Sequence, residues 1–350
     1  MILTALIMIS YHEKIMQAPL CRAVITDCDL GSCEIEQEEL AGIAAVEISQ
    51  CKTEQEVIAA AKEADGLLVQ YAPITRLVID SLPKCRVISR YGVGIEMIDL
   101  EAATRRGIAV CNVPGYCQEE VSDHACALML ALARKLDPLQ RSVRQGNWDV
   151  TIARPVWRLR GQVLGLLGFG KIARLVARKM AGFGLTIIAC DPHVTGEEIR
   201  RAGVEPVDLK ELFSRADILS LHVPLTQETA HLLGAKELRL LKKGAFLINT
   251  SRGQLVDEKA LYQALREGSL GGAALDVLER EPIPAGHPFL TLDNIIITPH
   301  AAFYSEVSIQ QLKRQTARAM ARMLKGEPRS NGDTFCVVNQ EAIRTRRMGG

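Results

Sequence analysis

The sequence predicts an α/β protein of two domains, and three observations lead to this prediction. Short apolar runs alternate with segments of helical periodicity along most of the chain, which is typical of parallel sheets covered by helices. A glycine-rich turn lies between two such apolar runs near the middle of the sequence. The chain has 350 residues, of which 48% are hydrophobic, and this length and composition suit two separate cores.

The first predicted domain precedes the glycine-rich turn. Buried strands are expected at 21–28, 66–69, 87–89 and 108–111, with helices at 53–64 and 99–106. Residues 1–20 are expected to be an N-terminal extension, because this apolar start is too short for a membrane span and lacks the basic segment of a signal peptide. A misassigned start codon, with Met16 as the true start, is one hypothesis for its origin.

The second predicted domain continues the alternation. An apolar helix at 119–135 leads into it, and 145–158 is expected to be irregular. Strands are expected at 163–167, 185–190, 218–222, 245–249, 272–276 and 294–297, and helices at 208–214, 235–241 and 258–267. Such a series predicts a doubly wound sheet. The amphipathic helix at 305–324 is expected to pack back on the first domain, which otherwise lacks a closing element, and the polar, basic tail from Asn331 is expected to fray.

The glycine-rich turn has the layout of a dinucleotide-binding βαβ unit. An apolar run leads into Gly168-Phe169-Gly170-Lys171-Ile172-Ala173, a helical segment follows, and a second apolar run ends at Asp191. Gly168 permits a sharp turn, and Gly170 lets the backbone approach a pyrophosphate at the helix N-terminus. Ala173 keeps the helix close to the sheet. The sequence therefore predicts a nucleotide site here.

Asp191 favours NAD over NADP as the nucleotide. A carboxylate at the end of the second strand accepts hydrogen bonds from ribose hydroxyls and repels a 2′-phosphate. Pro192 and His193 follow it, so no arginine is placed next to it to hold that phosphate. A helix that needed glycine only for packing would leave this acid unexplained.

Composition excludes several other classes of protein. The formal net charge of +1 predicts no strong attraction to nucleic acid or to a membrane surface. The ten cysteines form no C-x-x-C pair and no cluster with histidine, which disfavours a disulfide scaffold and a structural metal site. Several lie in apolar runs, so buried thiols in a reducing cytoplasm are expected.

Three polar residues follow predicted strands, where ligands bind in open α/β sheets. Arg252 comes after the strand at 245–249, Glu281 after the strand at 272–276, and His300 after the last strand. Hydride transfer to a carbonyl needs a proton donor, a group that stabilises the developing alkoxide and an anchor for the substrate carboxylate. Histidine suits the first role when a carboxylate supports it, and arginine suits the other two.

Each of these residues also has an ordinary interpretation. Arg252 could be a surface arginine, Glu281 lies in a charged stretch, and His300 could cap a loop after Thr-Pro. His124 lies within the apolar helix at 119–135 and is expected to be a packed or hydrogen-bonded histidine rather than part of a site.

Several motifs in order resemble one family. They read GFGKIA, CDP, SLHVPLTQETAHLL, LINTSRGQLVDEKAL, AALDVLEREP and TPHAAFYSE. Over residues 21–326 the chain is similar to the D-isomer-specific 2-hydroxyacid dehydrogenases. The resemblance implies two Rossmann-like doubly wound domains with a cleft between them. A flavodoxin-like substrate domain would comprise 21–118 and 301–335, an NAD-binding domain would comprise 119–300, and 336–350 would be a flexible tail.

The resemblance also implies roles for individual residues. Arg252, Glu281 and His300 would be the catalytic residues. NAD would be held by a set that includes the turn, the acid and residues after later strands: Gly168, Phe169, Gly170, Lys171, Ile172, Asp191, His222, Val223, Pro224, Thr250, Arg252 and Asp276. Substrate would be held by the loop Tyr91, Gly92, Val93 and Gly94 and by the side chains of Arg90, Tyr71 and Phe303. A cytoplasmic homodimer that binds a small 2-oxo or 2-hydroxy acid is implied.

Within the family, the segment after His300 looks closer to the C-terminal binding protein branch, the NAD(H)-sensing corepressors, with phosphoglycerate dehydrogenases as the neighbouring branch. Arg90 matches an arginine of the corepressor branch. That branch commonly has tryptophan at the position of Phe303 and histidine near that of Tyr71, so its substrate contacts are changed here. The sequence thus predicts an NAD-dependent dehydrogenase of a small D-2-hydroxy acid, with a corepressor-like sensor and a D-3-phosphoglycerate dehydrogenase as alternatives.

Overall fold

The computed structural model describes residues 20–327, 329 and 332–342. The chain forms two compact units, one of Met1–Tyr116 with Ser305–Gly350 and one of Cys117–Tyr304. The sequence placed the domain limits at 118 and 301, a few residues from these boundaries. Residues 1–19 of the expected extension at 1–20, including Met16, lie outside the described residues.

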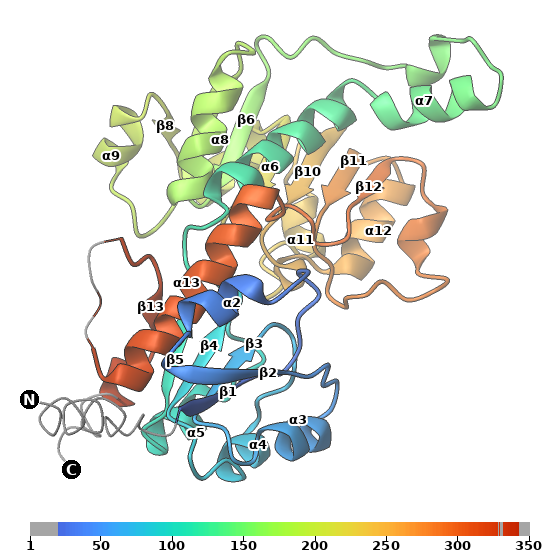
Figure 1. Ribbon diagram of the computed structural model, residues 1–350. Coiled ribbons are helices and arrows are strands. Elements are labelled where there is room, and N and C mark those ends of the chain that lie inside the picture. Colours follow the sequence, from blue (N-terminus) through green and yellow to red (C-terminus); the bar gives the residue numbers. More distant parts are fainter. Residues whose placement is uncertain (1–19, 328, 330–331, 343–350) are drawn as a thin grey trace, which may run out of the picture. The chain divides into compact units, whose positions relative to one another are not determined.

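The first unit is built on a six-stranded sheet in the order β13-β5-β4-β3-β1-β2 (Figure 1). Its strands are β1 (Cys21–Ile25), β2 (Ala44–Ile48), β3 (Gly66–Val69), β4 (Val87–Arg90), β5 (Ala109–Asn112) and β13 (Cys336–Val337). The five strands from β1 to β5 run parallel in the flavodoxin-like order, and β13 pairs antiparallel with β5. The predicted flavodoxin-like domain is therefore confirmed.

Alternate strand residues of the first unit face two different cores. Its helices are α2 (Glu34–Glu39), α3 (Glu54–Ala61), α4 (Arg76–Asp80), α5 (Leu100–Arg105) and α13 (Glu306–Lys325). Val24 packs with residues of α3 and α4, whereas Ala23 and Ile25 pack with Leu312 and Met320 of α13. The C-terminal helix thus closes one face of this sheet, as its amphipathic pattern predicts.

The prediction of a frayed tail is wrong for residues 332–342. Val337 pairs with Cys111 through β13, and the Val338 amide donates to the Val110 carbonyl at 2.8 Å. Phe335 is fully buried, and Asn339 Oδ1 accepts from the Val110 amide at 2.7 Å. One aromatic and one amide side chain in a polar stretch are enough to fasten the segment to the sheet edge. The remainder of the tail, 343–350, lies outside the described residues.

The second unit has a seven-stranded parallel sheet in the order β12-β11-β10-β9-β6-β7-β8. Its strands are β6 (Val163–Leu167), β7 (Thr186–Cys190), β8 (Glu205–Pro206), β9 (Ile218–Leu221), β10 (Ala245–Asn249), β11 (Leu270–Leu275) and β12 (Ile295–Ile297). Strand order reverses between β6 and β9, which is the ligand-binding switch point of a Rossmann-like sheet. The predicted doubly wound domain is confirmed.

Helices cover both faces of this second sheet. They are α6 (Gln118–Ala133), α7 (Leu136–Arg144), α8 (Lys171–Ala181), α9 (Gly196–Arg201), α10 (Leu209–Arg215), α11 (Ala235–Leu238) and α12 (Glu258–Arg266), with 3-10 turns η1 (Thr151–Ala153), η2 (Gly253–Leu255) and η3 (Pro288–Thr291). α6 and α8 pack together on one core, and α10 to α12 contribute to the other. The expected helix at 119–135 ends early because Lys135 takes a left-handed conformation (φ 54°), after which α7 begins.

Among the helices of the described chain, none combines the length and the apolar character that crossing a bilayer requires. In the same part of the chain, no group of three or more histidine, cysteine, aspartate or glutamate side chains is arranged to hold a metal ion.

Buried thiols give a first testable prediction. Burial raises the pKa of Cys85 and of Cys111 to about 12. These two thiols should therefore stay protonated and react with a disulfide reagent at pH 8 at least about 100-fold more slowly than in the unfolded chain. Because folding favours the neutral thiols, their contribution to stability is present below pH 9 and is lost as pH rises towards 12. Mass-spectrometric labelling rates and alkaline unfolding curves measure both effects; rapid native labelling would contradict the assignment.

Candidate active site

The predicted cofactor and catalytic residues of the second unit gather at the carboxyl ends of its strands. Gly168 to Ile172 follow β6, Asp191 follows β7, and His222 to Pro224 follow β9. Thr250 and Arg252 follow β10, Asp276 and Glu281 follow β11, and His300 follows β12. The carboxyl ends of parallel strands share one edge of the sheet. Residues more than one hundred positions apart in sequence therefore meet along that edge.

The glycine-rich turn has the conformation that the sequence predicts. Gly168 has φ 90°, and a Cβ there would lie 2.6 Å from the His222 carbonyl oxygen, so the turn after β6 requires glycine. The Phe169 amide donates to Asp191 Oδ2 at 2.7 Å, and the His193 amide donates to Oδ1 at 2.8 Å. Backbone amides thus hold the carboxylate of Asp191 in place beside the turn.

Two observations show that this edge fits a dinucleotide. A Cβ on Gly170, at the start of α8, would meet no protein atom within 4 Å, so the turn is open where a pyrophosphate would approach. The side-chain oxygen of Thr250 is buried and makes no hydrogen bond within the described residues. An orphaned buried hydroxyl is costly, and a ligand group would satisfy it. The residues present therefore fit NAD.

His222 is a neutral imidazole. Burial lowers its pKa to about 4, and its Nε2 lies 2.9 Å from Ser220 Oγ. It is followed by Val223 and Pro224 and supplies the carbonyl against which Gly168 packs. A ring that stays neutral at physiological pH is unsuited to donate a proton, so His222 is not the acid. Its predicted contact with the cofactor stays a prediction.

His300 and Glu281 form a close acid–base pair. His300 Nδ1 lies 2.7 Å from Glu281 Oε2, and the Leu278 amide donates to Glu281 Oε1 at 2.9 Å. Partial burial acts to raise the pKa of Glu281, but the hydrogen bond and charge of His300, the Leu278 amide and the charge of Arg252 together hold that pKa below its ordinary value. The carboxylate thus stays ionised and fixes the Nδ1–H tautomer of His300.

Arg252 contributes its positive charge to the lowering of the Glu281 pKa. It follows β10, where its Nη1 donates to the Ser251 carbonyl at 2.7 Å and its own carbonyl accepts from Asn249 Nδ2 at 2.8 Å. The structure therefore brings together all three residues that the sequence predicts as catalytic.

Asp276 has a role that the sequence did not reveal. Its carboxylate is 1% exposed and accepts hydrogen bonds from Thr298 Oγ1 at 2.6 Å and from the Ala301 and Ala302 amides at 2.8 and 2.9 Å. It therefore shapes the loop that carries His300; its predicted contact with the cofactor stays a prediction. His124 Nε2 lies 3.0 Å from Thr298 Oγ1, so the expected hydrogen-bonded histidine supports the same loop.

Phe303 lies beside His300, with ring centroids 6.2 Å apart in an edge-on arrangement. The other predicted substrate residues belong to the first unit, at the ends of β3 and β4. Tyr71 is exposed, whereas the Tyr91 ring is buried and its hydroxyl donates to Glu36 at 2.8 Å. The Tyr91 amide donates to Val69 O and the Gly92 amide donates to Arg90 O. The substrate contacts predicted for this loop stay predictions.

We expect Asp191→Ala to weaken NADH binding and to relax the choice of nucleotide. Loss of a carboxylate that accepts ribose hydrogen bonds should raise the Kd for NADH about 10- to 100-fold, and loss of its negative charge should improve relative NADPH binding. Fluorescence titration with both nucleotides measures the ratio. Asp208→Ala removes the N-cap of α10 and serves as the control for stability alone. An unchanged nucleotide ratio would contradict the role of Asp191.

Comparison with known proteins shows the family to which this chain belongs. The model of the D-isomer specific 2-hydroxyacid dehydrogenase NAD-binding domain matches residues 126–302. A glyoxylate reductase of Korarchaeum cryptofilum is 41% identical over 298 residues, 84% of this chain and 88% of that protein. A D-3-phosphoglycerate dehydrogenase of Methanocaldococcus jannaschii is 40% identical over 87% of this chain, which spans only 57% of that protein.

A solved structure extends the likeness to the whole fold. D-lactate dehydrogenase from Aquifex aeolicus, complexed with NAD and lactic acid, superposes with a TM-score of 0.80 at 29% identity, covering 93% of this chain and 98% of that one. The chain belongs to the D-isomer specific 2-hydroxyacid dehydrogenase family and is an NAD-dependent oxidoreductase of 2-hydroxy acids.

Proposed function

We propose that this protein reduces a short, unphosphorylated 2-oxo acid with NADH to the D-2-hydroxy acid, with Arg252, Glu281 and His300 as the catalytic residues. The observation that carries this proposal is the 2.7 Å contact between His300 Nδ1 and Glu281 Oε2 beside the charge of Arg252. It is the arrangement that carbonyl reduction with general acid catalysis requires.

The three side chains divide the chemistry between them. NADH supplies the hydride that reduces C2. The Arg252 guanidinium binds the substrate carboxylate and polarises the carbonyl, because it is always charged and presents a planar fork of donors. Glu281 accepts the Nδ1–H of His300, which leaves Nε2 of the imidazolium to donate the proton to the developing alkoxide. In the oxidative direction His300 Nε2 takes that proton back.

Substrate size is proposed from the surroundings of His300. The Phe303 ring stands next to the imidazole, which favours a compact group at C2. This chain matches 88% and 87% of the length of two relatives named glyoxylate reductase. The substrate class in that name is therefore the first choice for this chain. We assign Tyr71, Arg90, Val93 and Gly94 as further substrate contacts. Arg90 ends β4, Val93 and Gly94 lie in the loop after it, and Tyr71 follows β3.

A substrate panel tests this proposal. NADH oxidation is measured with glyoxylate, hydroxypyruvate, pyruvate, phenylpyruvate and 3-phosphohydroxypyruvate, and the chirality of each product that has a stereocentre is determined. The proposal expects the highest kcat/KM with glyoxylate or hydroxypyruvate. A clear preference for 3-phosphohydroxypyruvate would replace it with a phosphoglycerate dehydrogenase. Tight NADH binding without turnover of any acid would favour the corepressor-like sensor.

A homodimer is proposed from an exposed apolar surface of the second unit. α7 and the segment after it extend away from that unit's sheet (Figure 1). They expose Trp148, Val150 and Trp157 by 91, 75 and 69%, and a groove of about 500 Å³ lies between Trp157 and Phe183. Exposed apolar patches of this kind mark protein–protein interfaces.

We expect the protein to be a dimer, and we expect charged residues introduced into this surface to disrupt it. Sedimentation velocity should show a dimer for the wild type and mostly monomer for the Val150→Asp, Trp157→Asp double variant, because each carboxylate would have to be buried unpaired. Leu240→Asp, at another exposed apolar position of the same unit, should leave the dimer intact. A monomeric wild type would refute the proposal.

We also assign the protein to the cytoplasm. Most of its cysteines are buried, and none of those in the described part of the chain forms a disulfide, which fits a reducing compartment.

A further inference from the structure

The Glu281 carboxylate lies on an irregular segment that needs external support. β11 ends at Leu275, and 276–281 then leaves the sheet without regular secondary structure. A pair such as Glu281 and His300 must be held to within about half an ångström to work efficiently, and loops hold side chains less well than helices or strands. Contacts that fasten this segment to a regular element are therefore candidates for a functional role.

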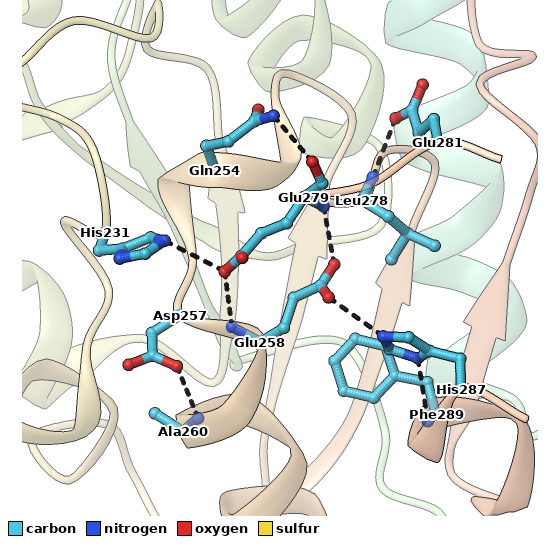
Figure 2. Close-up of polar contacts among 10 residues, drawn as sticks. All are labelled: His231, Gln254, Asp257, Glu258, Ala260, Leu278, Glu279, Glu281, His287 and Phe289. Carbon is cyan, nitrogen blue, oxygen red and sulfur yellow. Dashed lines mark hydrogen bonds and ion pairs between the residues drawn. The ribbon is translucent and has the colours of Figure 1, made fainter. Parts of the chain in front are cut away.

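Three contacts fasten the segment to the start of helix α12 and the turn before it. Gly253 packs against Leu278 so closely that an added Cβ would overlap the Leu278 carbonyl group. Gln254 Nε2 donates to the Glu279 carbonyl at 3.0 Å. Glu258 and Glu279 then bond reciprocally, because each backbone amide donates to the other's carboxylate, at 2.8 Å for the Glu279 amide and 3.2 Å for the Glu258 amide (Figure 2).

Glu258 is itself oriented by His287. The Phe289 amide donates to His287 Nδ1 at 3.3 Å, so Nδ1 is an acceptor and the proton lies on Nε2. Nε2 lies 3.2 Å from Glu258 Oε2, and the side chains of His287 and Glu258 are only 18% and 16% exposed. The His287 ring packs edge-on against Phe289, which is buried (Figure 2). Both oxygens of Glu258 thus accept hydrogen bonds, one from His287 and one from the Glu279 amide.

We propose that Glu258, oriented by His287, is a positioning residue that places the Glu281 carboxylate against His300. The connection runs from Glu258 to the Glu279 amide and through the backbone to Leu278, whose amide donates to Glu281 Oε1 at 2.9 Å. This inference rests on the proposed function, in which Glu281 supports His300. It adds a histidine–glutamate pair outside the reacting groups, His287 and Glu258, whose task is geometric.

The test compares variants at Glu258 and His287 with a matched control on the same helix. Glu258→Ala removes both acceptors, whereas Glu258→Gln keeps one acceptor oxygen for two donors. His287→Asn keeps a polar acceptor for the Phe289 amide but is too short to reach Glu258. The control is Asp257→Ala, which removes the N-cap of α12, a hydrogen bond to the Ala260 amide, without removing a contact to Glu279.

Two readouts separate positioning from stability. The first is the titration midpoint of the Glu281 carboxylate in the protein without nucleotide, followed by NMR on 13C-labelled glutamate and assigned by its loss in Glu281→Gln. The second is the pH profile of kcat/KM for 2-oxo acid reduction. His300→Gln should raise the midpoint, because the hydrogen bond and the charge of His300 hold the pKa of Glu281 down. Glu258→Ala should raise the midpoint by a smaller amount and lower kcat about 3- to 10-fold, with the Kd for NADH unchanged.

Each outcome decides one question. A His300→Gln protein with an unshifted Glu281 midpoint refutes the proposed pairing of Glu281 with His300. A shift in His300→Gln without any shift in the Glu258 and His287 variants overturns the positioning role alone. An equal shift in Asp257→Ala also overturns it, since any weakening of α12 would then suffice. If Glu258→Ala does not fold, Glu258→Gln and His287→Asn decide, and an unchanged midpoint in both counts against the inference.

Discussion

His300→Gln is expected to reduce kcat by about 100- to 10,000-fold, the range associated with loss of general acid–base catalysis. Glutamine retains a polar side chain of similar length but has no proton that it can transfer at neutral pH. The loop itself should survive, because the His300 amide still donates to the Asp276 carbonyl at 2.8 Å and Asp276 still binds the Ala301 and Ala302 amides. NADH should therefore bind with wild-type affinity.

Steady-state and single-turnover kinetics with the best acid of the substrate panel measure this loss, and fluorescence titration measures NADH binding. The same substitution at His193, whose side chain is exposed, provides the matched control. Turnover within tenfold of wild type in His300→Gln would remove His300 from the mechanism. The neutral His222 offers no replacement acid, since its pKa of about 4 keeps it unprotonated.

Arg252→Ala is expected to raise KM for the 2-oxo acid about 100-fold and to lower kcat about 10- to 100-fold. Loss of a bidentate charged contact weakens substrate binding, and loss of the polarising charge raises the barrier for hydride transfer. Arg252→Lys should recover part of kcat but little of KM, because an ammonium restores the charge and not the planar fork.

The pH profile provides a second signature for Arg252. The charge of Arg252 helps to hold the Glu281 pKa low, so its removal should raise that pKa and move the acid limb of kcat/KM to higher pH. The Kd for NADH should change little in comparison with KM for the acid. Unchanged KM in Arg252→Ala would refute its role as the carboxylate anchor.

Local patterns were sufficient to predict most of the second unit. The strand at 245–249 and the βαβ unit that ends at Asp191 coincide with β10 and with β6, α8 and β7. Arg252, Glu281 and His300 were predictable because each follows an apolar strand, and parallel strands deliver such residues to one edge. Their chemistry is carried by residue type and order along the chain, which a sequence displays directly.

Features that depend on distant partners were not predictable in this way. β13 forms because Asn339 bonds to the Val110 amide and Phe335 enters a core built by other segments. The Tyr91 ring is buried because Glu36 of α2 accepts its hydroxyl, and nothing near Tyr91 in sequence indicates that partner. Asp276 also accepts hydrogen bonds from a loop that follows a different strand, and nothing near Asp276 in sequence indicates those partners.

The first unit is built from two separate stretches of the sequence, which has a consequence for biosynthesis. Cys117–Tyr304 is one continuous stretch, so the second unit has its complete set of segments before α13 and β13 are synthesised. The segment up to Tyr116 emerges from the ribosome first, but its fold is completed only later. α13 then covers Leu68 and Val87, and β13 pairs with β5. Until then its apolar face lies open to nonspecific association. Truncation before α13 or β13 would therefore damage the part of the chain that was made first.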